Sequence, residues 1–83
     1  MRNTKALVGF VNTVRLENTR IIKSDSYLLK ELDNLYVVDN MDDCQATTIR
    51  LLDYLETYHG YTFEDRKEIV FNVMKDWSNP YSE

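Results

Sequence analysis

The two residues best suited to nucleophilic chemistry are the single cysteine, Cys44, and the single histidine, His59. A cysteine nucleophile needs a histidine base within hydrogen-bond reach. These two are 15 residues apart on a segment with helical periodicity, which separates them by roughly 22 Å along one helix axis. We therefore expect a core cysteine and a helix-terminal histidine, not a catalytic pair.

An acidic cluster, Asp39, Asp42 and Asp43, offers the oxygen ligands that calcium prefers. A calcium loop that begins at Asp39 would place Met41 at its third position and Arg50 where a bidentate glutamate belongs, and it has no glycine at the sixth position. A helix start explains the cluster better, because Asn40 can cap it and acidic residues favour the first turn. We expect no metal and no cofactor.

Paired carboxylates such as Asp53 and Glu56 can do acid–base work when a cleft perturbs their pKa values. Helical geometry turns both away from the apolar stripe of Leu51 and Leu55, toward solvent. The sequence contains no glycine-rich phosphate loop and no paired-cysteine motif. The sequence therefore favours a protein without enzymatic activity.

Two glycines and one proline in 83 residues supply few of the turns that sheets require, and apolar residues recur instead at helical spacing. Four helices are expected. The first covers about 4–16, the second follows a cap at Ser24 or Ser26 and ends near 36, the third covers 41–59, and the fourth lies between a cap at Thr62 and the Asn79-Pro80 pair.

The first segment has alternative interpretations in both its type and its length. Its apolar residues follow a helical stripe, although an alternation over 8–16 would also suit a strand. Asn18 falls on the same stripe, so the helix either stops near Glu17 or buries an asparagine with a partner. The sequence leaves open whether 17–23 continue this helix.

The third segment has the most regular spacing. Its seam is formed by side chains separated by four or three residues, namely Cys44, Thr48, Leu51, Leu55 and Tyr58. Gly60 suits the left-handed position after the helix end. In the fourth segment the apolar face is Ile69, Val70, Val73, Met74 and Trp77. We expect Tyr36 and Tyr58 in the core.

These segments predict one all-α domain over 1–83. Short connections make neighbouring helices antiparallel, so an up-down bundle of about four short helices is the simplest arrangement that buries every stripe. An orthogonal packing, or a helix-turn-helix pairing of the last two helices, remains an alternative.

The formal net charge of -4 and the pI near 4.9 argue against a general attraction to nucleic acid or anionic lipid. The distribution is uneven, because 1–23 carry five basic side chains and one acidic one. No stretch is long and apolar enough to span a membrane, and the first 20 residues lack the apolar core of a signal peptide. We expect a cytoplasmic protein, with the host cytoplasm as one option.

A recognition surface is suggested by residues that do not fit the core. Ile49 and Phe71 fall on outward faces beside charged side chains, as at protein interfaces. Tyrosine suits recognition because it offers large area at low entropy cost. The candidate partner-binding residues are Asp39, Asp42, Asp43, Ile49, Asp53, Tyr54, Glu56, Tyr61 and Phe71.

These residues favour a small acidic protein-binding module, an accessory or inhibitor protein of bacterial or phage type. Its acidic, tyrosine-bearing surface would dock on a basic site of a larger protein. One alternative is a helical transcriptional or nucleic-acid-associated regulator that uses the basic N-terminal segment. Another is a homodimer in which Ile49 and Phe71 fill a symmetric interface.

Overall fold

The computed structural model describes residues 5–15 and 24–78, which form four helices and no strand. They are α1 (Lys5–Val14), α3 (Ser26–Tyr36), α4 (Met41–His59) and α5 (Arg66–Ser78). The predicted all-α bundle is confirmed, and the strand alternative for the first segment is wrong as far as Val14. Asn18, the question of 17–23 and the Asn79-Pro80 pair lie outside the described residues.

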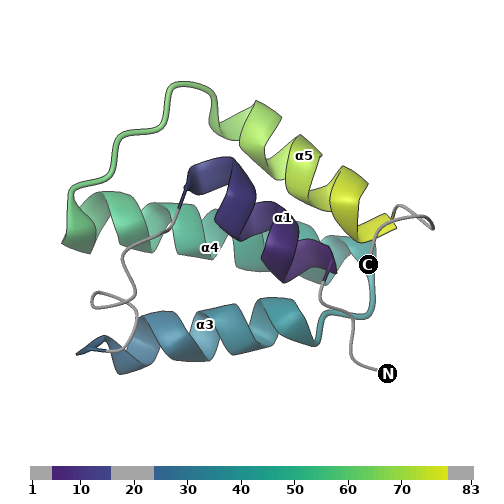
Figure 1. Ribbon diagram of the computed structural model, residues 1–83, viewed down its shortest axis with the longest axis horizontal. Coiled ribbons are helices and arrows are strands. Elements are labelled where there is room, and N and C mark those ends of the chain that lie inside the picture. The colour runs from purple at the N-terminus through teal and green to yellow at the C-terminus, as the bar shows by residue number, and fades with distance from the viewer. Residues whose placement is uncertain (1–4, 16–23, 79–83) are drawn as a thin grey trace.

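The four helices pack in a ring. α1 contacts α3 and α5, and α4 contacts the same two helices from the other side. Successive described helices run in alternating directions, with α1 and α5 side by side and both inclined relative to α3 and α4 (Figure 1). The molecule is therefore an up-down antiparallel bundle, as the short connections predict.

The contact between α1 and α5 depends on a glycine. A Cβ at Gly9 would lie 2.6 Å from Asp76 Oδ2 and 2.9 Å from Asp76 Cβ, distances too short for either atom to remain in place. Glycine within a helix costs about 1 kcal/mol relative to alanine. Here that cost permits close approach of the two helices, while Phe10 and Val14 of α1 are buried in the core.

The start of α3 differs from the prediction, because Asp25 caps it and neither serine does. Asp25 Oδ1 accepts a hydrogen bond of 3.1 Å from the backbone N–H of Leu28. A carboxylate at this position also meets the positive end of the helix dipole, which favours it over a serine hydroxyl.

The bounds and caps predicted for α4 are confirmed. Asn40 accepts a 2.8 Å hydrogen bond from the N–H of Asp43, and Gly60 takes the left-handed conformation with φ of 70°. The expectation that Tyr58 is a core residue is wrong, since 70% of its surface is exposed. The buried seam of α4 ends one turn earlier, at Leu55.

The start of α5 also lies later than predicted. Asp65 Oδ1 accepts a hydrogen bond from the N–H of Glu68, and the helix begins at Arg66, so the proposed cap at Thr62 is wrong. Residues 61–65 are not helical and lead from the end of α4 to α5 (Figure 1). Tyr61 and Phe63 stack there, with ring centroids 5.9 Å apart, against the core.

Candidate functional site

A groove of about 600 Å³ lies between α4 and α5, and we call it the α4–α5 groove. Its lining residues are Gln45, Ile49, Asp53, Arg66, Lys67, Val70, Phe71 and Met74. Ile49 is 39% exposed and Phe71 is 64% exposed. The structure thus brings together two outward-facing apolar residues that the sequence had placed on separate helices.

One end of the groove carries a charged bridge. Arg66 donates a hydrogen bond to Asp53, and its Nε lies 3.3 Å from Glu56 Oε1 without hydrogen-bond alignment. Asp53 and Glu56 were expected to face solvent alone, whereas they pair with a cation from α5. Their charge is therefore partly neutralised, although the Asp53 side chain remains 60% exposed.

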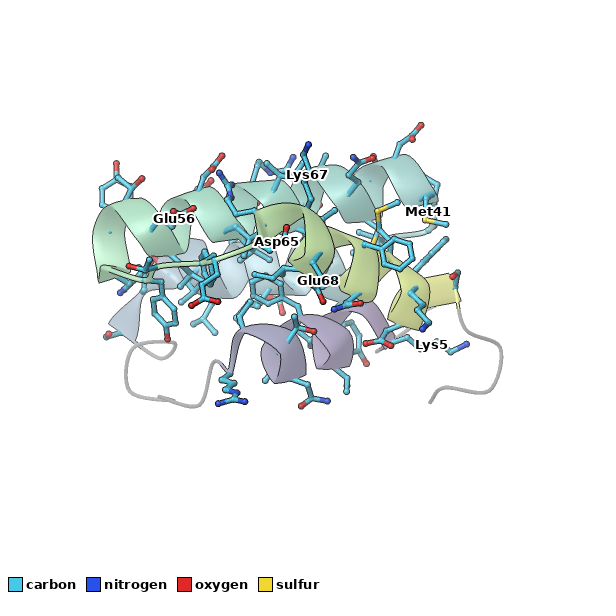
Figure 2. All side chains as sticks on the ribbon, turned by 90° about the horizontal axis from the view of Figure 1, so that it is seen from above. Lys5, Met41, Glu56, Asp65, Lys67 and Glu68 are labelled. Carbon is cyan, nitrogen blue, oxygen red and sulfur yellow. The ribbon has the colours of Figure 1, made fainter. Side chains whose placement is uncertain are left out.

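The face of α5 is divided between two neighbours. Figure 2 shows Lys67 on the side of α4 and Glu68 on the side of α1, while Met41 and Glu56 lie toward opposite ends of α4. Lys67 lines the groove, and no ion pair of Lys67 occurs within the part of the chain that the structure describes. The groove therefore has an apolar floor between an exposed cation and the Asp53 carboxylate.

The acidic cluster at the start of α4 is split between two surfaces. All three aspartates are exposed. Asp42 lies three and seven residues before Gln45 and Ile49, on the same helical stripe as the groove. Asp39 and Asp43 instead line a hollow of about 420 Å³ on the α3 side and accept hydrogen bonds from Asn40. Only Asp42 extends the groove surface.

A hydrogen-bonded group at the opposite end of α4 was not predicted. Asp25 Oδ2 accepts a 2.5 Å hydrogen bond from the hydroxyl of Tyr54 and lies 2.8 Å from His59 Nε2. The Tyr54 hydrogen bond, followed by those from the Leu28 N–H and His59, lowers the pKa of Asp25 to about 2 against an opposing effect of burial. The same bond, with burial, raises the pKa of Tyr54 to about 12.

This group, which we call the Asp25 clamp, ties the start of α3 to the end of α4. Tyr54 is therefore half-buried and engaged within the molecule, so it is a poorer contact candidate than its sequence position indicated. Tyr61 lies against the core, in a hollow between the end of α1 and the start of α5. The structure does not bring Tyr61 to the groove.

Sequence reasoning missed two exposed tyrosines. Tyr27 is 45% exposed and Tyr58 is 70% exposed, and their rings flank that of Tyr54. Helical spacing of Tyr54 and Tyr58 could have indicated the pair on α4, because residues four apart are neighbours. The contribution of Tyr27 from α3 depends on tertiary packing, which no local spacing reports.

Cys44 and His59, the two residues considered for nucleophilic chemistry, have different surroundings. Cys44 is fully buried, and burial raises the pKa of its thiol, which disfavours the reactive thiolate. His59 contacts Asp25 and Tyr54 rather than a nucleophile. Within residues 5–15 and 24–78, no cluster of three potential ligands could hold a metal ion, and no helix is both long and apolar enough to cross a membrane.

The basic N-terminal segment is only partly described. Lys5 and Arg15 lie in the described part, whereas Arg2, Arg20 and Lys23 lie outside it. Arg15 follows the end of α1 and adopts a left-handed conformation with φ of 55°. The structure therefore places no continuous basic face on α1.

Comparisons with protein-family models, curated proteins and solved structures found no match for this chain. A function can therefore be proposed from the chemistry of this chain's own residues.

Proposed function

We propose that this protein is a non-enzymatic protein-binding module whose contact surface centres on the α4–α5 groove. The observation that carries the proposal is the exposure of Phe71, at 64%, beside a groove of about 600 Å³ lined by Ile49 and Met74. Exposed apolar groups rimmed by polar ones favour association, because a partner removes them from water.

The acidic net charge of the chain favours a partner with basic side chains, and the groove itself is lined by charges of both signs, Asp53 beside Arg66 and Lys67. Asp42 is exposed on the groove stripe, Asp53 retains 60% exposure, and the whole chain carries a formal net charge of -4. Complementary charge increases the rate of encounter and suppresses wrong partners. An accessory or inhibitor protein of bacterial or phage type, acting in the cytoplasm on a basic site of a larger protein, fits this combination.

The proposal can be tested by site-specific photocrosslinking in the cells of origin. A photoreactive residue at Gln45 lies in the groove, and one at Lys30 of α3 is exposed on a helix that does not line it. The proposal predicts a discrete crosslinked protein from position 45 that is lost when Phe71→Asp is added. The same product from position 30, or its persistence with Phe71→Asp, would place the contact elsewhere.

A second candidate is a homodimer through the same groove. The groove face combines a projecting Phe71 with a hollow, and it carries an exposed Lys67 as well as an exposed Asp53. A two-fold interface needs such self-complementarity, because each patch meets its own copy. Sedimentation equilibrium distinguishes the candidates, since a dimer gives a mass that rises with concentration and returns to the monomer with Phe71→Asp.

A further inference from the structure

Three tyrosine rings form a row on the α3 side of α4, which we call the tyrosine row. The centroids of Tyr27 and Tyr54 are 4.5 Å apart at an interplanar angle of 33°, and those of Tyr54 and Tyr58 are 4.8 Å apart at 37°. The two outer rings, of Tyr27 and Tyr58, are 45% and 70% exposed. The row therefore presents aromatic surface to solvent at both ends.

The middle ring of the row is held in place by the Asp25 clamp. Tyr54 donates its hydroxyl to Asp25 Oδ2 at 2.5 Å, and Asp25 is itself held by His59 and by the N–H of Leu28. A ligand that stacks on this row would not have to order Tyr54. Such preorganisation favours binding, because ordering side chains on association costs free energy.

A hollow of about 290 Å³ lies beside the row, lined also by Arg50, Asp53 and Thr57. Arg50, whose side chain is 49% exposed, is paired within the molecule, since its Nε donates a 2.8 Å hydrogen bond to Glu31, a residue only 5% exposed. Asp53 uses Oδ1 for Arg66, and among the described contacts its Oδ2 has no donor. The hollow thus combines aromatic faces with an accessible carboxylate oxygen.

This combination suits one class of ligand group, a planar cation. Aromatic faces attract cations, and a guanidinium stacks flat on a ring while its N–H groups donate to a carboxylate. A lysine ammonium is more strongly hydrated and does not stack in this way. Phosphates would meet the Asp53 carboxylate, so the charge disfavours nucleic acid at this position.

We propose that the tyrosine row and Asp53 form a binding site for an arginine side chain presented on a peptide segment. The site goes beyond the α4–α5 groove, since it lies on the α3 side of α4 and specifies arginine as the residue that binds. The two surfaces adjoin at Asp53, which lines both hollows.

The experiment is an NMR titration of the full chain with three short peptides that differ in one residue, arginine, lysine or citrulline, at physiological ionic strength. The proposal predicts shifts of the Tyr27 and Tyr58 ring resonances, with the arginine peptide bound most tightly and the uncharged citrulline peptide not bound. Equal affinities for arginine and lysine, or shifts confined to other residues, would overturn it.

Two variants separate ring stacking from the general attraction of an acidic protein. Tyr58→Ala removes an exposed ring and is expected to weaken arginine binding about two- to fivefold, the range of an exposed cation–π contact. Asp53→Asn is expected to weaken it, whereas Asp42→Asn, which removes the same charge from the same helix outside this hollow, is not. Equal losses from the two aspartate variants would show attraction by net charge alone.

A further control makes failure of this proposal distinguishable from failure of the groove. Phe71→Asp alters the groove and lies outside the hollow beside the tyrosine row, so the arginine peptide should bind that variant normally. Loss of peptide binding in Phe71→Asp would contradict a separate arginine site. Helical circular dichroism of each variant checks that the bundle is intact.

Discussion

The two sides of α4 meet their neighbours in different ways. Toward α3, polar side chains cross the contact in pairs, with Arg50 donating to the buried Glu31 at one point and the Asp25 clamp at another. Toward α5, one cation, Arg66, serves two carboxylates, and the apolar side chains of the groove remain partly in water. Toward α3 the buried polar groups are paired within the molecule, whereas toward α5 the groove retains apolar surface that a partner can bury.

The largest expected effect is on the free energy of unfolding when a large apolar side chain is truncated. We compare one such side chain from each side of α4. Leu28 of α3 is fully buried, so Leu28→Ala should lower the free energy of unfolding by about 2–5 kcal/mol. Phe71→Ala should change it by no more than about 0.5 kcal/mol, because that ring is exposed. Urea unfolding of both variants checks this. A large loss with Phe71→Ala would mean that the groove is part of the core.

A smaller loss of folding free energy is expected when a carboxylate on either side of α4 is removed. Glu31→Ala removes hydrogen bonds with Arg50 and Asn34, and should cost about 1–3 kcal/mol of folding free energy. Asp53→Ala breaks a solvent-exposed pair with Arg66 and should cost about 0.2–1 kcal/mol. Thermal and urea unfolding measure both losses. The reverse order would contradict the comparison.

A third expected effect is the pH dependence of the Asp25 clamp. The folded pKa of Asp25, about 2, lies below its ordinary 3.8, so its stabilising contribution is present above pH 3.8 and is lost as the pH falls toward 2. The folded pKa of Tyr54, about 12, lies above its ordinary 10.0, so its contribution is present below pH 10.0 and is lost as the pH rises toward 12.

The variant Asp25→Asn isolates this dependence from that of the other titrating groups. The difference in unfolding free energy between the wild-type chain and the variant should shrink in both pH ranges. Urea unfolding across a pH series measures it. A difference that does not change with pH would show that the Tyr54 hydrogen bond has no energetic role.

Local signals in the sequence predicted α4 well. Asn40 and Gly60 each act on the backbone within a few residues, and both caps lie where the sequence placed them. The same reasoning was wrong at α3, because Ser24, Asp25 and Ser26 can all cap a helix, and the structure shows Asp25 in that position.

Contacts between residues that are far apart in the chain could not be predicted from the sequence. The Tyr54 hydroxyl and His59 ring reach Asp25 across 29 and 34 residues, and Gly9 meets Asp76 only after the bundle has formed. The outward positions of Ile49 and Phe71 followed from helical periodicity, but their meeting in one groove depends on how α5 packs on α4. The face of a helix on which a residue lies follows from its spacing in the sequence. A site formed by two helices depends in addition on how those helices pack.

The central claim is that the α4–α5 groove is the partner-binding surface. Methyl NMR of the chain, titrated with the partner protein that photocrosslinking identifies, tests this claim most directly. Ile49 and Met74 line the groove, whereas Ile69 lines a hollow on the α1 side of the same helix as Met74. The account predicts that the Ile49 and Met74 methyl signals shift on binding while that of Ile69 does not. Shifts at Ile69 with none at Ile49 and Met74 would contradict it.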